Sequence, residues 1–484
     1  MIKNQMVTVT IEDMGNDGEG IGKVDGYTLF VKGAIIGDVA KVKVLKAKKT
    51  YGYAKVEELV TPSPDRVAPR CAVAGRCGGC QMQHLSYEKQ LEHKADKVKN
   101  CLQRIGGLSE EVLDAVMEPI IGMDEPFHYR NKAQYPVGTN KDGKPVMGFY
   151  AGHSHNIIDC TDCEIQEPVN AAILPVIKAF MEEYHISAYD EEKGTGLLRH
   201  VLTRVGFHTK EVMVCLIING KKFPKAEVLA ERIKAAVEGF VPADESYAGT
   251  EHAGEQYGYV LKSFCLNINT VKSNVILGNE IIPVYGETYI TDSIGEIKYQ
   301  ISPLSFYQVN PEQTVKLYNK ALDYADLNGD EIVWDLYCGI GTISLFLAQK
   351  AKQVYGVEIV PQAIEDAKKN AVLNGLTNAE FFVGAAEDVM PAKYKESDGK
   401  MRADVICVDP PRKGCEESLL DTIVAMEPKR IVYVSCDPAT LARDVKYLGE
   451  RGYAVTKVCP VDQFAHTGHV ETVVKMQRYE EGKK

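Results

Sequence analysis

The sequence predicts an α/β protein with a small N-terminal β-barrel, a mixed α/β middle domain and a C-terminal domain that contains a parallel sheet. Short alternating apolar segments separated by glycines fill the first sixty residues. From about residue 301 onward, apolar strands alternate with amphipathic helices, which is the pattern of a parallel sheet with helical crossovers. A chain of 484 residues is also too long for one core. We predict domains at 1–62, 63–290 and 291–484, and residues 85–124 could pack on the last of them.

The composition is that of a folded protein, with 45% hydrophobic and 25% charged residues. The N-terminus lacks the apolar core of a signal peptide, and no later segment reaches transmembrane length. We therefore expect a cytoplasmic protein that does not associate with a membrane. In that compartment the 13 cysteines should not form a disulfide framework, and some of them should serve metal binding or catalysis. The net charge of −11 requires any RNA-binding surface to be a local patch.

The predicted barrel supplies such a patch. Strands are expected at 6–11, 27–31, 38–45 and 53–56, where apolar and polar residues alternate. Several lysines fall in a stretch without acids, interleaved with Tyr51 and Tyr53: Lys41, Lys43, Lys46, Lys48, Lys49 and Lys55. This pattern suits phosphate contacts and base stacking, and it equally suits a solvated edge strand that deters aggregation.

Cysteines cluster directly after the proline-rich linker at 61–64. Cys71, Cys77 and Cys80 lie close together beside two glycines, and Cys160 or Cys163 could supply a fourth thiol. Four thiolates suit zinc or an iron–sulfur cluster, and spacing alone favours zinc. The middle domain that follows, at about 127–283, should contain a strand at 211–218 and a helix at about 171–184.

The C-terminal domain shows a nucleotide-type site. In the stretch 331–342, an apolar strand runs into Gly339-x-Gly341, and a helix at 343–350 follows. The next strand, 353–358, ends at Glu358, a carboxylate suited to ribose hydroxyls. A dehydrogenase is the first alternative, but the third glycine of its fingerprint is missing. Asp409-Pro410-Pro411-Arg412, at the end of the strand 403–408, favours a methyltransferase.

Cys436 is the predicted nucleophile. It ends the strand 430–435, and Asp437 and Pro438 are suited to cap and begin a helix, whose N-terminus favours a thiolate. Near the C-terminus, His469 and Glu471 should share one face of a final strand, with Glu471 as the acid/base group. A buried inert cysteine and a solvated carboxylate are the alternatives.

Two resemblances extend these predictions. Residues 14–22, 30–33 and 37–38 resemble a TRAM domain, an OB-like barrel found in RNA-modifying enzymes. Five motifs resemble the RNA uracil-5-methyltransferases that act on ribosomal and transfer RNA: residues 305–310, 335–339, 409–412, 435–438 and 469–471. This second resemblance spans nearly the whole chain and implies a Rossmann-like class I methyltransferase domain.

The resemblance also implies functions for particular residues. S-adenosylmethionine should be bound by Gln308, Tyr337, Thr342, Glu358 and Asp409. Cys436 should attack carbon 6 of uracil, Glu471 should remove the proton from carbon 5, and Phe306 should contact extruded bases. Cys71, Cys77, Cys80 and Cys163 should hold a [4Fe–4S] cluster, with Cys160 as the alternative fourth ligand.

Within this family, the barrel and the cysteines favour 23S ribosomal RNA as the substrate of a monomeric enzyme. A transfer-RNA uracil-5-methyltransferase is the closest alternative. A non-catalytic iron–sulfur RNA-binding factor is the alternative from a different class, and the presence of Cys436, Glu471 and Asp409 together argues against it.

Overall fold

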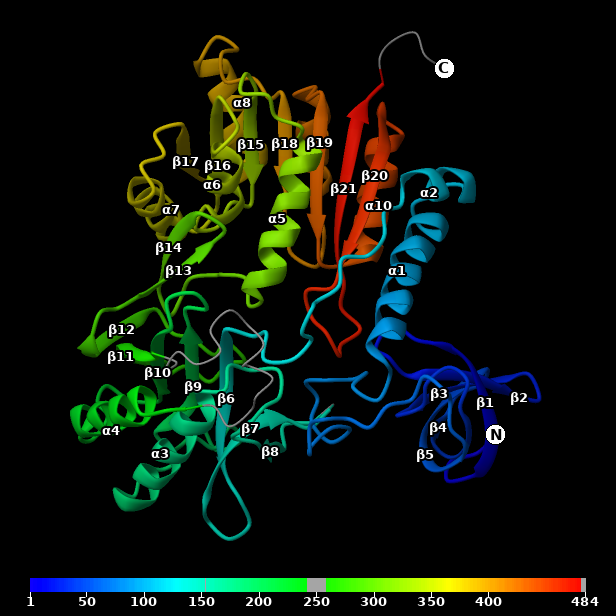
Figure 1. Cartoon of the computed structure of the whole chain (residues 1–484), viewed down its shortest axis with the longest axis vertical. Coiled ribbons are helices and arrows are strands. Elements are labelled where there is room, and N and C mark those ends of the chain that lie inside the picture. Colours follow the sequence, from blue (N-terminus) through cyan, green and yellow to red (C-terminus); the bar gives the residue numbers. More distant parts are fainter. Residues whose placement is uncertain (153, 242–257, 480–484) are drawn as a thin grey trace. The chain divides into compact units, whose positions relative to one another are not determined.

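The computed structural model describes residues 1–152, 154–241 and 258–479, and its contacts divide the chain into two units (Figure 1). The first, here called the barrel unit, contains Met1–Pro126, Pro410–Leu420 and Ile431–Lys484. The second, here called the two-sheet unit, contains Phe127–Asp409 and Asp421–Arg430. No helix in the described ranges is long and apolar enough to cross a membrane.

The N-terminal residues form the predicted barrel, which is closed and has the strand order β1-β2-β3-β5-β4. Its strands are β1 (Met6–Met14), β2 (Gly20–Val24), β3 (Tyr27–Lys32), β4 (Val39–Ala47) and β5 (Tyr51–Thr61). Alternate residues point inward, so that small and branched side chains such as Val9, Leu29 and Val42 fill the interior. The prediction of a small barrel is confirmed.

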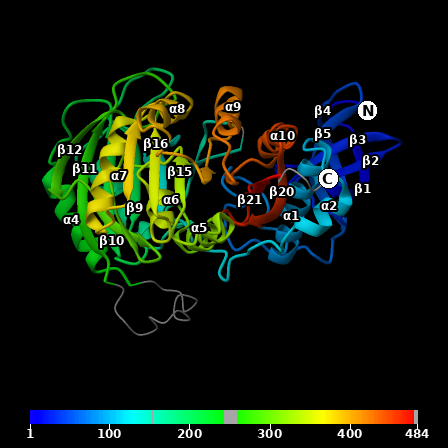
Figure 2. The ribbon, with the colours of Figure 1, turned by 90° about the horizontal axis from the view of Figure 1, so that it is seen from above.

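Helices and a short sheet complete the barrel unit. Helix α1 (Tyr87–Arg104) packs beside α10 (Pro438–Gly449), as Figure 2 shows, and α2 (Glu110–Val116) follows α1. Strands β19 (Arg430–Ser435), β21 (Glu471–Arg478) and β20 (Tyr453–Val461) are neighbours in that order, and β20 and β21 are antiparallel. Met117 and Ile121 form parallel bridges to β20, so the chain after α2 runs along this sheet.

The two-sheet unit contains a seven-stranded sheet with the order β12-β11-β10-β9-β6-β7-β8. Its strands are β6 (Lys132–Thr139), β7 (Pro145–Tyr150), β8 (Ile157–Asp159), β9 (Leu198–Val205), β10 (Glu211–Ile218), β11 (Val260–Ile268) and β12 (Glu280–Gly286). Helices α3 (Asn170–Glu183) and α4 (Ala226–Glu238) pack on it, with Phe180 and Leu229 in the shared core (Figure 1). The predicted strand at 211–218 and helix at 171–184 are both present.

The second sheet of this unit is parallel, with the order β17-β16-β15-β18. The hairpin of β13 (Ile290–Ile294) and β14 (Ile297–Ile301) and the helix α5 (Pro311–Ala325) precede it. The alternating elements that follow are β15 (Ile332–Leu336), α6 (Thr342–Ala348), β16 (Gln353–Glu358), α7 (Pro361–Leu373), β17 (Ala379–Val383), α8 (Ala386–Glu396), β18 (Val405–Val408) and α9 (Glu417–Ala425). This alternation is the one that the sequence predicts.

Candidate active site

The chain turns sharply after β15 into a loop whose backbone is held in left-handed conformations. Tyr337, Gly339 and Gly341 have φ angles of 74°, 54° and 82°. A Cβ at Gly341 would lie 3.2 Å from the Phe381 ring, so a larger residue would meet both a backbone penalty and a neighbour. The amides of Tyr337 and Cys338 both donate to the Val357 carbonyl at 3.0 Å, which fixes the loop to the adjacent strand β16.

Glu358 occupies the position that the sequence predicts, at the end of β16 beside this loop. Its Oε2 accepts a hydrogen bond from the Gly339 amide at 3.3 Å, and its Oε1 accepts one from the Val360 amide at 3.0 Å. The parallel register of β15 and β16 brings the carboxylate to the glycine loop. A carboxylate in this place is suited to binding ribose hydroxyls.

Tyr318, on the buried face of α5, brings together three of the predicted cofactor residues. Its hydroxyl donates to Thr342 Oγ1 at 3.1 Å and is also hydrogen-bonded to the Gln308 side chain. Burial raises the pKa of Tyr318, and the nearby Asp409 carboxylate raises it further. Gln308, Thr342 and Asp409 therefore all lie near the Tyr318 hydroxyl. The sequence did not indicate this role for Tyr318, because its position in an amphipathic helix is typical of an ordinary core residue.

Two acids of this unit are strongly affected by their surroundings. Burial raises the pKa of Asp335 to about 7 and that of Asp409 to about 7, and Asp335 contributes to the shift at Asp409. Ser344 Oγ donates to Asp335 Oδ2, whereas Oδ1 is buried with no hydrogen-bond partner among the described residues. A bound cation or donor would favour the charged form of these carboxyls, and a sulfonium cofactor carries such a positive charge.

The seven-stranded sheet holds the segment 305–310 that contains Gln308. Asn131 Nδ2 donates to the Gln308 carbonyl at 3.2 Å, and Arg204 donates to the Ser305 carbonyl. Asn310 then caps α5 by accepting a hydrogen bond from Gln313 N at 3.2 Å. The side chain of Phe306 is 71% exposed within this fixed segment, so it is available to contact another molecule.

In the barrel unit, Cys436 lies where β19 ends and α10 begins, as predicted. Asp437 caps the helix, because its Oδ1 accepts hydrogen bonds from Ala439 N at 2.9 Å and Thr440 N at 3.2 Å, and Pro438 is the first helical residue. Cys436 is partly exposed. A thiol at this end of a 12-residue helix is close to its positive dipole end, which favours the thiolate.

The other two cysteines at strand ends of the C-terminal half are poor nucleophiles. Cys338 is 3% exposed and Cys407 is fully buried. Burial raises the pKa of both thiols well above the usual range. Both therefore remain protonated at neutral pH, whereas Cys436 is accessible.

Glu471 begins β21, opposite Val461, and is 4% exposed. The prediction that His469 and Glu471 share one face of a strand is wrong. His469 precedes the strand and is exposed, so strand alternation does not apply to it. Partial desolvation of the imidazole ring and the positive charges of Arg412 and Lys97 lower the pKa of His469, which favours its neutral form.

The segment leading to Glu471 is held by backbone contacts. His466 has a φ of 66° and is 3% exposed, and its carbonyl accepts hydrogen bonds from the amides of Gln81 and Met82 at 2.9 Å. Its own amide donates to Gln90 Oε1 at 2.8 Å. A left-handed backbone conformation at a non-glycine residue costs energy, so these hydrogen bonds must stabilise the conformation of His466.

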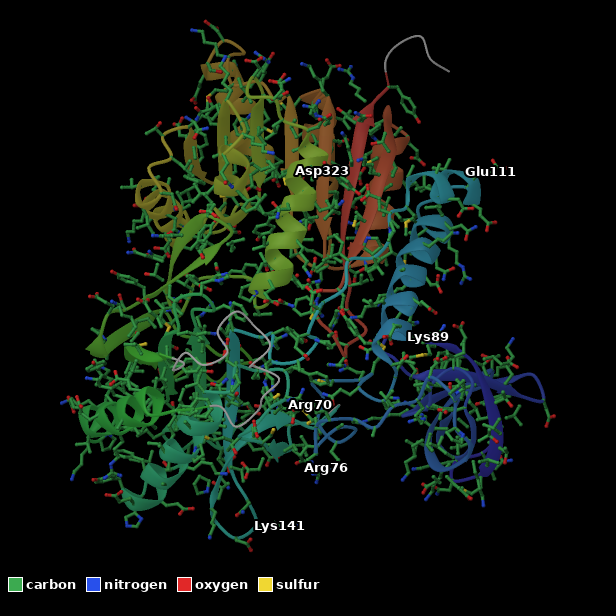
Figure 3. The ribbon with its side chains drawn as sticks, viewed as in Figure 1. Arg70, Arg76, Lys89, Glu111, Lys141 and Asp323 are labelled. Carbon is green, nitrogen blue, oxygen red and sulfur yellow. The ribbon has the colours of Figure 1, made fainter. Side chains whose placement is uncertain are left out.

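The cysteines predicted to bind a cluster do not form a metal site in the described ranges. Cys71, Cys77 and Cys80 lie in the barrel unit, in a turn-rich segment with exposed Arg70 and Arg76 (Figure 3). Cys77 Sγ accepts a hydrogen bond from the Gly79 amide at 3.3 Å.

The remaining two cysteines lie in the two-sheet unit. Cys160 is hydrogen-bonded to Cys163, which lowers the pKa of Cys160. Among the residues that the structure describes, no three Cys, His, Asp or Glu side chains are arranged to hold a metal ion. The four-thiolate shell therefore stays a prediction from the sequence motif.

One face of the barrel combines aromatic rings with lysines. The rings of Phe30, Tyr51 and Tyr53 are mutual neighbours, with centroids 5.7 to 5.8 Å apart, and Tyr53 is 44% exposed. Lys46 lies opposite Tyr53, and Lys43 lies opposite Lys55. Strand β4, which carries Lys43 and Lys46, pairs with β1 and β5, and β5 pairs with β3 and β4. Neither strand is an open edge, so protection of an edge strand does not explain these lysines.

Comparison with known proteins agrees with this geometry. Residues 272–479 match the family model described as tRNA (Uracil-5-)-methyltransferase, and residues 3–56 match that of the TRAM domain. An uncharacterized RNA methyltransferase of Clostridium tetani is 48% identical over 100% of this chain and 98% of its own length. Another, from Halalkalibacterium halodurans, is 50% identical over 98% of this chain and 97% of its own.

A solved structure is similar over nearly the full length. The Pyrococcus abyssi tRNA (uracil-54, C5)-methyltransferase in complex with S-adenosyl-L-homocysteine has a TM-score of 0.73 and 28% sequence identity. The match covers 97% of this chain and 100% of that one.

Proposed function

Because the chain belongs to the RNA (uracil-5-)-methyltransferase family and carries an RNA-binding TRAM domain, we propose that it methylates carbon 5 of specific uridines in 23S ribosomal RNA. S-Adenosylmethionine is the methyl donor in this proposal. The observation that supports it most directly is the partial exposure of Cys436 at the start of α10, whereas Cys338 and Cys407 of the two-sheet unit are buried.

Cys436 begins the reaction, because carbon 5 of uracil is not nucleophilic enough to be methylated directly. The Cys436 thiolate forms a bond to carbon 6, and the electrons of the C5–C6 double bond move to give an enolate. Bound S-adenosylmethionine supplies an electrophilic methyl group on a sulfonium. Carbon 5 bonds to that methyl group, and the electron pair of the broken bond goes to the sulfonium sulfur.

Glu471 completes the reaction as the general base. Its carboxylate takes the proton from carbon 5, the C–H electron pair restores the C5–C6 double bond, and the bond from carbon 6 to Cys436 breaks to return the thiolate. A base held in structured RNA must first be turned out of its stack, which costs a few kcal/mol. The exposed ring of Phe306 is suited to stack on bases displaced in this way.

The two-sheet unit is suited to hold the cofactor. Glu358 would accept hydrogen bonds from ribose hydroxyls, and Gln308 and Thr342 would orient the cofactor with Tyr318 behind them. Tyr337 would line the same loop. The Asp409 carboxyl, whose pKa burial raises to about 7, would be favoured in its charged form beside a sulfonium.

The barrel would bind RNA through its aromatic and lysine-bearing face. Bases can stack on exposed rings regardless of sequence, and lysines neutralise phosphates. The neighbouring rings of Phe30, Tyr51 and Tyr53, together with Lys43 and Lys46, provide both functions on a protein whose net charge is −11. This local patch resolves the conflict between an acidic protein and a polyanionic substrate.

A genetic experiment tests whether ribosomal RNA or transfer RNA is the substrate. We expect deletion of this gene to remove 5-methyluridine from 23S ribosomal RNA and to leave transfer RNA unchanged, as mapped by mass spectrometry of both RNAs. Wild-type protein should restore the modification, and Cys436→Ala protein should not. Loss from transfer RNA alone would support the transfer-RNA alternative, and no loss from either would support the non-catalytic RNA-binding factor.

An iron–sulfur cluster on Cys71, Cys77, Cys80 and Cys163 is part of the same proposal, and its support comes from the sequence motif. No group of side chains in the described part of the chain is arranged to hold a metal ion, and no step of the reaction is assigned to a cluster. Protein purified without oxygen should contain iron and acid-labile sulfide, and a Cys77→Ser variant should lose both. Stoichiometric zinc without iron would contradict the cluster. We also propose that the enzyme is a cytoplasmic monomer.

A further inference from the structure

One face of α1 contacts the segment 462–468, which leads to Glu471. Its contacting side chains are three or four residues apart, so they lie on the same face of the helix: Tyr87, Gln90, Lys94 and Lys97. Tyr87 contacts Asp462, and Gln90 contacts His466. Lys94 donates to the Phe464 carbonyl, and Lys97 donates to the Gly468 carbonyl. Helix α1 therefore supports this segment along most of its length.

Lys97 links this segment to the barrel. Its Nζ donates to the Gly468 carbonyl at 2.8 Å and to the Asn16 carbonyl of the β1–β2 loop at 3.4 Å. The Asp437 carboxylate, next to Cys436, interacts with it electrostatically. A single ammonium group thus lies among the barrel, the nucleophile's helix cap and the segment before Glu471.

The barrel also touches this segment directly. A Cβ built at Gly468 would lie 2.2 Å from the Asn16 carbonyl oxygen, a backbone atom that cannot move aside as a flexible side chain can. Only glycine allows the β1–β2 loop to approach so closely. The barrel therefore has a structural contact with the segment that carries the proposed base, in addition to its proposed contact with RNA.

We propose that Lys97 is a positioning residue that fixes the Glu471 segment against the barrel, and thereby sets the rate at which methylated RNA is released from Cys436. This inference rests on the proposed function. Glu471 lies three residues after Gly468, so a displaced Gly468 carbonyl moves the base relative to the proton that it removes. Cys436 is fixed separately, by the Asp437 cap and by Ser435 Oγ, which accepts a hydrogen bond from Asp437 N at 3.2 Å.

Loss of Lys97 should therefore slow elimination more than addition. Elimination needs Glu471 to take the carbon 5 proton while the bond from carbon 6 to Cys436 breaks, and misplacement of a reacting group by about 1 Å can cost up to roughly a hundredfold in rate. Addition and methyl transfer depend on the nucleophile, whose cap remains intact.

The test compares Lys97→Met and Lys97→Arg with Lys99→Met as the matched control. Lys99 lies on the same helix and forms an exposed pair with Asp114 at 2.7 Å. In single turnovers with an RNA substrate, we expect Lys97→Met to accumulate the covalent RNA adduct and to release product at least about tenfold more slowly. Adduct formation with 5-fluorouridine RNA, which requires no elimination, should stay close to the wild-type rate.

Lys97→Arg should restore release, because a guanidinium keeps the charge and the donors, and a cavity of about 630 Å³ beside Lys97 gives it room. A pH profile adds a second readout. Burial lowers the pKa of Lys97, against the influence of Cys101, Asp437, Asp17 and Glu19. Release by the wild-type enzyme should therefore decline at alkaline pH as the ammonium is lost, and release by the arginine variant should decline less.

Gly468→Ala provides an independent test if Lys97→Met does not fold. Its new Cβ would collide with Asn16 and should slow release in the same way, whereas Gly449→Ala, whose Cβ meets no atom within 4 Å, should not. Wild-type release rates in both Lys97→Met and Gly468→Ala would overturn the inference. Equal slowing of addition and release, without rescue by arginine, would also overturn it. Failure of the wild-type enzyme to form 5-methyluridine would instead refute the proposed function.

Discussion

Cys436→Ala protein is expected to bind RNA and S-adenosylmethionine but to form neither 5-methyluridine nor a covalent RNA complex. Without the thiolate, carbon 6 receives no electrons and carbon 5 never becomes nucleophilic. Glu471→Gln should fail later: it can complete methyl transfer but cannot accept the carbon 5 proton, so the RNA should remain attached through Cys436. Denaturing gels with labelled RNA distinguish the two, because only the glutamine variant should show a retarded band.

Two controls test the separate roles of Cys436 and Glu471. RNA with 5-fluorouridine at the target should trap the wild-type enzyme, since fluorine cannot leave carbon 5 as a proton does. Glu450→Gln, a change at an exposed carboxylate after α10, should leave turnover unaltered. If Cys436→Ala protein still formed the fluorouridine adduct, the assignment of the nucleophile would be wrong, and Cys338 and Cys407 would have to be tested.

The second large effect is on stability. Lys94 and Asp462 form an ion pair at 2.6 Å in which both side chains are 0% exposed, and Tyr87 also donates to Asp462 at 2.8 Å. Asp462→Asn leaves the buried ammonium without its counter-charge, and breaking such a pair typically costs about 3–5 kcal/mol of unfolding free energy. Urea denaturation should show this loss at pH 7.

The loss of unfolding free energy in the Asp462→Asn variant should depend on pH in a definite direction. Burial lowers the pKa of Lys94, while Asp462 raises it, so the Asp462→Asn variant should lower it further. In the variant, the unfolded state then binds more protons than the folded state at pH values between the folded pKa and the usual lysine value of about 10.4. The wild-type pKa of Lys94 is lowered less, so the stability deficit should shrink as the pH rises from the folded pKa of the variant to that of the wild type, and it should change little above that. A deficit that grows with pH would contradict this account of the pair.

A double substitution separates the charge from the packing. Lys94→Met together with Asp462→Asn removes both charges, so the pair should lose less stability than the sum of the two single changes. Additive effects would mean that the two side chains do not interact, contrary to their distance. Lys99→Met, at the exposed pair with Asp114, should change stability by less than about 1 kcal/mol.

Features that depend on neighbouring residues could be predicted from the sequence. Alternation and glycine spacing predicted the barrel, and Asp437 with Pro438 predicted the start of α10, because strand faces and helix caps are local properties. Glu358 was placed correctly because consecutive parallel strands end at one edge of a sheet. The prediction that His469 and Glu471 share one face of a strand is wrong because β21 begins at Glu471, two residues after His469.

Features that depend on distant segments could not be predicted in this way. Gln90 and Lys94 are polar residues at buried positions of α1, and Lys94 lies on the same line of the helix as Val98 and Leu102. Polar residues at these buried positions indicate that each has a buried partner. They do not identify Asp462 as the partner of Lys94, and nothing near Tyr318 in the sequence indicates Thr342 or Gln308.

The ion pair between Lys94 and Asp462 also has a consequence for biosynthesis, because it joins residues 368 positions apart. At about 5–20 residues per second, Asp462 is translated roughly 20–70 seconds after Lys94. The barrel has its own core and needs no later residue to close, so it can fold during that interval. Helix α1 cannot complete its packing in that interval, because its buried Lys94 pairs with Asp462 and the helix packs beside α10, both of which are translated later. Residues 87–104 therefore wait longer than the barrel for their final packing partners during synthesis.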